Sequence, residues 1–327
     1  MSAGEMFSGE MSVKMSAKKQ LKMQRNMEYA AIAGLRLCAI ISIIITAMIF
    51  LSVISEAYSF FNNYALFDFL FGTHWSPQNA TQVASDGVAS GSFGFLPLLC
   101  GTLMITAIAL CVAVPVGLYS AIYMNEYAKP QIRRIAKPLL EVLAGIPTVV
   151  YGFFAITTMA PLLQHVGGVL HLDIASESAL AAGLVMGIMM IPLMSSMSDD
   201  AIKAVPRTLK DASLAMGATR SETMKKVVLP AALSGIMGGI LLATSRAIGE
   251  TMIVVMAAGL SANLTYNPLE SVTTITVQIV ALLGGDQDFA SNKTLAAFAL
   301  GLTLFIFTLI LNIIALLVVK RYRQVYE

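Results

Sequence analysis

The sequence predicts an all-α polytopic membrane protein, built as a bundle of six transmembrane helices. Of its 327 residues, 57% are hydrophobic and only 12% are charged, whereas about a quarter of the residues of an ordinary soluble protein are charged. Six nearly uncharged segments are long enough to cross about 30 Å of hydrocarbon as helices. This composition excludes a cytosolic enzyme, a nucleic-acid binder and a disordered scaffold.

The six predicted spans follow from runs of apolar residues. The first run exceeds the apolar core of a typical signal peptide, so we expect an uncleaved helix. Lipid offers the backbone no hydrogen-bonding partner, so only helices or closed barrels can cross it, and these runs are too long for barrel strands. In chain order, we expect spans at 30–54, 95–123, 139–164, 178–197, 232–259 and 295–319.

Two of the connections between spans contain apolar or aromatic segments. An aromatic series between Tyr58 and Trp75 follows the first span and predicts a helix in the membrane interface, where aromatic rings collect. The connection after the fifth span contains the apolar stretch 272–283, which is too short to span the membrane. This stretch predicts a re-entrant or interfacial helix.

Lysine and arginine predict the orientation, because short cytoplasmic loops are enriched in them. The N-terminal tail holds five, the connection after the second span four, the connection after the fourth span six and the C-terminal tail three, together 18 of the 21 basic residues. We therefore expect a cytoplasmic tail at 1–29, a transmembrane domain at 30–319 surrounded by membrane lipid, and a second cytoplasmic tail at 320–327.

A charged pair lies inside the predicted fifth span. Arg246 is near its centre, and Glu250 follows in Ser-Arg-Ala-Ile-Gly-Glu-Thr. A central arginine costs about 2.5–3.5 kcal/mol on insertion scales, and in a continuous helix the two side chains would share one face. The pair predicts a polar pathway for an anion, with Ser245 and Thr251 adding hydroxyl groups. The alternative is a structural ion pair that locks helices together.

The chemistry of this pair suggests a selectivity. A guanidinium offers a planar fork to an oxyanion, and a nearby carboxylate accepts a hydrogen bond only from an anion that retains a proton. Phosphate near neutral pH retains a proton and sulfate does not, so Glu250 is hypothesised to favour phosphate. Glu141, near the cytoplasmic end of the predicted third span, is expected to be structural.

The connection at about 198–230 is typical of two short helices around a glycine. Apolar residues such as Leu214, Met216 and Val227 interrupt its many charges, which leaves an apolar face to bury. The natural partner of such a face is another protein. The alternative is a solvated loop whose helices lie in the membrane interface.

The spacing in this connection resembles the EAA signature of ATP-binding-cassette importer permeases, the MetI-like family. That signature has an acidic residue followed by small residues, a glycine at the seventh position and a terminal Leu-Pro, and in the family it forms a coupling helix that fits a cleft on the ATPase. The resemblance assigns ATPase coupling to Asp211, Ala212, Gly217, Leu229 and Pro230. Asp211 stands in place of the usual glutamate.

Further segments resemble the permeases of the high-affinity phosphate uptake system, and their C subunit (PstC-like) more than their A subunit. These segments are Phe93–Thr102, Ala113–Val116, Ala144–Gly152 and Arg246–Met252. The resemblance implies a subunit in a bacterial cytoplasmic (inner) membrane that pairs with a second homologous permease of the A type. It further implies a dimer of ATP-binding-cassette ATPases, a periplasmic phosphate-binding protein, and a substrate site at Arg246 and Glu250.

No catalytic residue, cofactor or metal site is expected in this chain. It has no G-x-x-x-x-G-K-[ST] motif, so ATP and Mg²⁺ belong on the partner ATPase. Cys38, Cys100 and Cys111 lie in apolar runs without metal-ligand spacing. Two other functions stay open: a permease for sulfate, molybdate or another oxyanion, and an ion-coupled secondary anion carrier or channel that needs no ATPase.

Overall fold

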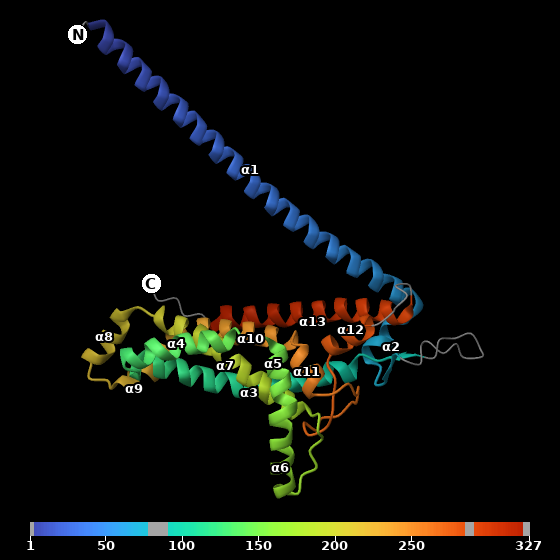
Figure 1. Cartoon of the computed structure of the whole chain (residues 1–327). Coiled ribbons are helices and arrows are strands. Elements are labelled where there is room, and N and C mark those ends of the chain that lie inside the picture. The colour runs from blue at the N-terminus through green and yellow to red at the C-terminus, as the bar shows by residue number, and fades with distance from the viewer. Residues whose placement is uncertain (1–2, 78–90, 285–290, 323–327) are drawn as a thin grey trace. The chain divides into compact units, whose positions relative to one another are not determined.

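The structure, a computed structural model, describes residues 3–77, 91–284 and 291–322. The chain divides into two units, Met1–Ser55 and Glu56–Glu327. The first unit is the larger part of helix α1 (Ala3–Asn63), which Figure 1 shows in blue. Its residues from 31 to 50 are all exposed. The predicted tail at 1–29 is therefore helical and continuous with the first span from Ala3 onward.

The second unit holds the other elements. These are α2 (Leu66–Phe71), β1 (Trp75–Ser76), β2 (Ser92–Phe93), α3 (Leu96–Ile122), η2 (Tyr123–Tyr127), α4 (Pro130–Ala144), α5 (Thr148–Phe154), η3 (Ala155–Met159), α6 (Ala160–Leu170), α7 (Ala179–Lys203), α8 (Arg207–Ala215), α9 (Arg220–Thr223), η4 (Met224–Val228), α10 (Leu229–Ile248), α11 (Met252–Ala257), α12 (Ile275–Leu283) and α13 (Asn292–Tyr322). The two strands pair antiparallel, and the η segments are single π-helical turns.

Six helical segments among the described residues are long and apolar enough to cross a membrane, which confirms the predicted number. They are Asn26–Asn63, Leu96–Tyr127, Thr148–Leu170, Ala179–Lys203, Arg220–Ile248 and Asn292–Lys320. The last helix reaches Tyr322, so only the end of the predicted tail, 323–327, lies outside the described residues.

The third span begins later than the predicted residue 139. Helix α4 ends at Ala144, and α5 starts only at Thr148. Pro147 disfavours helical backbone at the residue before it, so the apolar run that sequence reasoning joined into one helix divides in two. The Tyr151 hydroxyl donates to the Leu143 carbonyl at 2.9 Å, which supplies a partner to a carbonyl that the ended helix leaves free.

The core of the second unit lies where α3 packs along α7, and α10 packs on α7 as well. Glycines set the closeness of this contact. A Cβ added at Gly117 would come within 2.5 Å of the Met194 Cβ, and one at Gly187 within 2.8 Å of the Val112 Cβ. Lipid tails are as apolar as the side chains, so no hydrophobic effect drives helices together in the membrane. Helices there associate through close van der Waals packing instead.

The aromatic series after the first span divides into buried and exposed rings. Phe60, Phe69 and Phe93 are almost fully buried and pack edge-on, with ring centroids 5.5–5.7 Å apart around Phe60. Trp75 donates to the Gln278 side-chain oxygen at 2.9 Å, which ties this cluster to α12. A short helix, α2, does form in this segment and exposes Phe67, while the buried rings pack within the protein, and its place in the membrane interface stays a prediction.

The stretch 272–283 forms the short helix α12, which confirms that it is too short to span. Ile275 and Leu282 are almost fully buried, in the same cluster as α13 side chains. Protein therefore covers at least one face of this helix.

The glycine contact between α3 and α7 leads to a stability prediction. Gly117→Ala should destabilise the protein by about 1–3 kcal/mol, because the new methyl group overpacks the contact with Met194. The matched control is Gly238→Ala on α10, where nothing lies within 4 Å and alanine favours the helix by about 1 kcal/mol. Thermal unfolding of the detergent-purified protein measures both. Equal midpoints for the two variants would contradict the packing argument.

Candidate functional site

Arg246 lies in the last turn of α10, is exposed, and lines a pocket of about 230 Å³. Side chains from η2, α4, α7 and α10 form this pocket, which we call the Arg246 pocket. Its lining residues are Met124, Lys137, Leu140, Glu141, Ala144, Met189, Pro192, Leu193, Ser196, Asp199 and Arg246. Arg246 therefore borders a space that is lined by both polar and apolar side chains, and its pathway role stays a prediction.

Arg246 forms no ion pair with any residue that the structure describes. The pocket also contains the cation of Lys137 and the carboxylate of Glu141, which lie one turn apart on α4. The sequence predicted a structural role for Glu141. Because α4 ends before α5 begins, it is a separate helix, and its side chains line this pocket.

The prediction that Arg246 and Glu250 share one face of a continuous helix is wrong. Helix α10 ends at Ile248, and α11 begins only at Met252. The Glu250 carbonyl accepts from the Thr276 hydroxyl at 2.9 Å, and its carboxylate accepts from the Thr251 backbone N–H at 3.3 Å. Glu250 is buried and does not line the Arg246 pocket.

The helix breaks here for identifiable reasons. Glycine and threonine are weak helix formers, and they stand at 249 and 251. The Thr276 hydroxyl supplies the hydrogen bond that the Glu250 carbonyl loses when the helix ends. Irregular backbone at membrane depth persists only where protein groups satisfy it in this way.

The two residues predicted to add hydroxyl groups to the pathway donate their hydrogen bonds to other groups of the protein. Ser245 donates to the Asn312 side-chain oxygen of α13 at 2.8 Å, and the Thr251 hydroxyl donates to the Gly249 carbonyl at 3.4 Å. Neither lines the Arg246 pocket. Of the four predicted pathway residues, the structure therefore brings only Arg246 to this pocket, and the pathway roles of the other three stay predictions.

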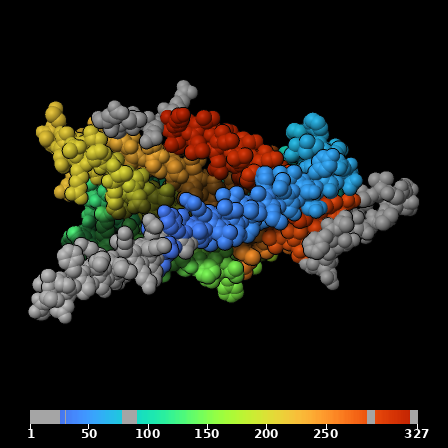
Figure 2. Space-filling model, turned by 90° about the horizontal axis from the view of Figure 1, so that it is seen from above, coloured from blue at the N-terminus to red at the C-terminus, as the bar shows by residue number. Residues whose placement is uncertain are grey.

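The EAA loop, residues 204–230, begins later than predicted because α7 continues to Lys203. It lies at one end of the second unit, where Figures 1 and 2 show it in yellow. Helix α8 presents exposed Asp211 and Ala212, and Met216 directly after it is 88% exposed. Leu214 is exposed as well, so the apolar side chains that the sequence predicted to need a partner are accessible here.

Gly217 ends the first half of the EAA loop with a left-handed backbone, φ +86°. The second half begins with a capping box between Thr219 and Glu222 and continues into α10. These features confirm the prediction of two short helices around a glycine.

The end of the EAA loop is anchored rather than exposed. Val228 is buried, and Leu229 packs in part against the same cluster, together with the ends of α3 and α7. Pro230 occupies the first turn of α10, where a missing N–H is tolerated. Of the five predicted coupling residues, Asp211, Ala212 and Gly217 are therefore accessible, Leu229 packs against the bundle, and Pro230 begins α10.

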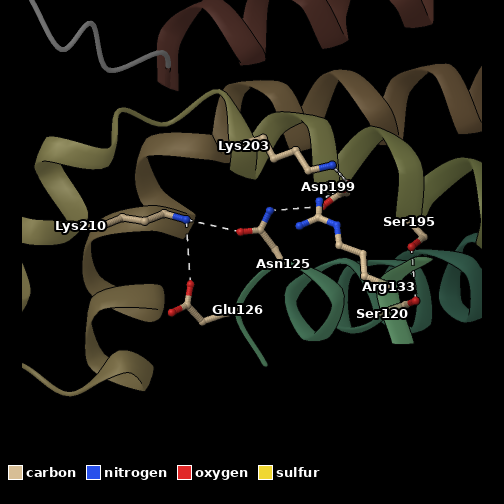
Figure 3. Close-up of polar contacts among 8 residues, drawn as sticks. All are labelled: Ser120, Asn125, Glu126, Arg133, Ser195, Asp199, Lys203 and Lys210. Atoms are coloured by element: carbon tan, nitrogen blue, oxygen red, sulfur yellow. Dashed lines mark hydrogen bonds and ion pairs between the residues drawn. The ribbon is translucent and has the colours of Figure 1, made fainter. Parts of the chain in front are cut away.

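A second polar cluster escaped sequence reasoning (Figure 3). The Asp199 side chain is only 5% exposed and accepts from Asn125 Nδ2 at 3.2 Å and Arg133 Nη2 at 3.3 Å, and it also pairs with Lys203. In the EAA loop, Lys210 donates to the Asn125 side-chain oxygen at 3.4 Å. Sequence reasoning counted these basic residues only as markers of orientation. The available signal was an acidic residue directly after a long apolar run.

Comparison with known families decides what kind of protein this is. A family model described as "Binding-protein-dependent transport system inner membrane component" matches residues 113–324. The chain belongs to this family of transport permeases. Membership confirms the predicted MetI-like fold and a multi-pass membrane protein, and it implies association with other permease subunits and with ATPase subunits.

Curated relatives match most of the chain. The phosphate transport system permease protein PstC 1 of Mycobacterium tuberculosis is 34% identical over 77% of this chain and 81% of its own length. The phosphate transport system permease protein PstC of Pasteurella multocida is 31% identical over 88% and 89%. A probable ABC transporter permease protein, YqgH of Bacillus subtilis, is 31% identical over 82% and 83%.

A solved structure shares the fold. The inward-facing MetNI methionine ABC transporter contains a chain that superposes with a TM-score of 0.51 and 20% identity, covering 70% of this chain and 94% of that one. At this identity the likeness concerns the fold alone.

The backbone of Gly217 leads to a prediction about assembly. Gly217→Val should destabilise the local turn by about 1–2 kcal/mol or more, because a residue with a Cβ is strained at φ +86°. The amount of ATPase that copurifies with the tagged chain should fall, since α8 would no longer be presented in the same direction. Gly168→Val is the control, because Gly168 is an exposed helical glycine with nothing within 4 Å. An equal ATPase yield from both variants would refute the prediction.

Proposed function

We propose that this chain is the permease subunit of an ATP-driven importer of inorganic phosphate. It forms half of the transmembrane pathway beside a second homologous permease subunit of the A type. The observation that carries the proposal is Arg246, which lines its pocket without an ion-pair partner among the described residues, in a chain similar to permeases that are named for phosphate transport. The chain acts in transport and is not an enzyme; ATP and Mg²⁺ bind to the ATPase subunits.

Anion recognition follows from the charges of the pocket. Arg246 offers a bidentate fork to two phosphate oxygens, and Lys137 adds a second positive charge. A carboxylate accepts the hydrogen of a singly or doubly charged phosphate and repels a fully ionised sulfate. Glu250 is the acceptor that the sequence suggests, and Glu141 is the acceptor that the pocket lining suggests.

The orientation follows from the distribution of basic residues. The EAA loop with Lys203 directly before it, the connection after the second span and both tails carry 18 of the 21 lysines and arginines, which favours a cytoplasmic location for all of them. The protein then lies in a bacterial cytoplasmic membrane with both termini inside. An ATPase dimer binds the EAA loop at Asp211, Ala212 and Gly217, and a periplasmic binding protein delivers phosphate from outside.

ATP supplies the energy through the ATPase pair. Closure of the pair on ATP moves the EAA loop and turns the pathway outward, and hydrolysis returns it to the inward-facing state. Two alternatives remain distinguishable by experiment. A permease for another oxyanion would take up sulfate or molybdate in preference to phosphate, and a secondary carrier would transport without ATP.

The role of Arg246 can be tested by neutralisation. Arg246→Gln should reduce phosphate uptake by the complete complex about tenfold or more, because a charge-assisted bidentate contact contributes about 1.5–3 kcal/mol. Uptake of radioactive phosphate by proteoliposomes measures this. The control is Arg134→Gln, since Arg134 is an exposed cation of α4 outside the pocket lining. Normal uptake by Arg246→Gln would remove the proposed site.

A selectivity assay distinguishes the roles of the two candidate carboxylates. Whichever of Glu250 and Glu141 accepts the phosphate hydrogen should, when changed to glutamine, lower the preference for phosphate over sulfate about fivefold or more, since the like-charge repulsion of sulfate is lost. The ratio of phosphate to sulfate uptake is measured for Glu250→Gln and Glu141→Gln in parallel. An unchanged ratio in both variants would dispose of the proton-based selectivity.

A further inference from the structure

The Asp199 cluster joins three elements at one buried carboxylate. Asp199 lies near the end of α7, and its donors come from η2 (Asn125), from α4 (Arg133) and from the last residue of α7 (Lys203). Taking a carboxylate out of water is costly unless hydrogen bonds and opposite charges compensate it. The cluster therefore fixes the relative positions of α4, α7 and the end of the second span.

Asp199 also lies between two pockets. On one side it lines the Arg246 pocket. On the other side, three of its partners, Asn125, Arg133 and Lys203, line a pocket of about 520 Å³ whose wall includes Lys210 and Asp211 of the EAA loop. A continuous series of polar contacts runs from Lys210 to Asn125 and on to Asp199, as Figure 3 shows.

The charge of Asp199 matters to an anion in the Arg246 pocket. That pocket is lined by two cations, Lys137 and Arg246, and by two carboxylates, Glu141 and Asp199. Arg133 and Lys203 compensate Asp199 from outside the pocket lining, so the pocket is effectively positive while the cluster is intact. If Asp199 loses one of its donors, its charge is less well compensated and its repulsion weakens the binding of an anion in the pocket.

We propose that Asp199 is a positioning residue that couples the position of the EAA loop to the anion affinity of the Arg246 pocket. The proposal rests on the proposed importer function and adds a residue to which neither the family resemblance nor the comparisons assign a role. Displacement of α8 pulls Lys210 away from Asn125, which loosens Asn125 from Asp199. The carboxylate then loses part of its compensation, and the pocket releases its anion. Movement of the loop is thereby converted into a change of charge beside the substrate.

The test compares two adjacent carboxylates in the complete importer. Asp199→Asn removes the buried charge and keeps the shape, whereas Asp200→Asn removes the charge of its exposed neighbour on the same helix. Proteoliposomes that contain both permeases and the ATPase, supplied with binding protein, are assayed for ATP hydrolysed and anion accumulated in the same vesicles. We expect the amount transported per ATP to fall about fivefold or more for Asp199→Asn and to be unchanged for Asp200→Asn, in keeping with a coupling free energy of about 1 kcal/mol or more.

Two further variants separate coupling from folding. Asp199→Glu, which restores the charge, should recover most of the ratio, and Lys210→Met should lower the ratio in the same direction as Asp199→Asn. The double variant should be no worse than Asp199→Asn alone, because both changes interrupt one series of contacts. Equal ratios for Asp199→Asn and Asp200→Asn, or no recovery with glutamate in an assembled complex, would overturn the proposal.

The experiment distinguishes a failure of the Asp199 proposal from a failure of the proposed phosphate function. All variants are assayed with phosphate and with sulfate, and the ratio is taken with whichever anion the unaltered complex accumulates. A preference of the unaltered complex for sulfate would refute the phosphate function, while the Asp199 comparison is still made with sulfate. An unaltered complex that transports neither anion would refute both.

Discussion

Lipid supplies no hydrogen-bond donor or acceptor, and two interruptions of helices in this protein show how the bundle meets that constraint. Where α10 gives way to α11, Thr276 donates to the Glu250 carbonyl. Where α4 ends before Pro147, Tyr151 donates to the Leu143 carbonyl. Each break occurs where a neighbouring helix or loop can replace the missing backbone partner, so the positions of the breaks depend on how the bundle is packed.

The same constraint separates the two charged groups that matter most. Asp199 is buried, and three donors from three elements compensate it. Arg246 has no ion-pair partner among the described residues, and a pocket lies beside it. A charge that the protein satisfies internally holds elements together, whereas a charge left beside a cavity is available to a ligand. Position within one bundle thus gives opposite tasks to two ionisable residues.

Much of the fold could be predicted because local composition determines it. The apolar runs gave the correct number of spans, and the glycine at 217 gave the turn between the two short helices of the EAA loop. The predictions failed where two successive helices have the same apolar composition as one continuous helix. The third span begins at Thr148 instead of 139, and Arg246 and Glu250 do not share a helix face, since hydropathy alone does not reveal a break at Gly-x-Pro or Gly-Glu-Thr.

The sequence by itself determined the membrane class, the spans, the family and the residue, Arg246, whose charge needs an explanation. These follow from properties that add along the chain: hydropathy, charge and the spacing of a motif. Only the tertiary structure decided which groups surround Arg246, that Glu141 and Lys137 lie beside it, and that Asp199 collects donors from residues more than 60 positions away in the chain. Such contacts depend on the rotation and closeness of packed helices, which the glycines between α3 and α7 allow but no local pattern specifies.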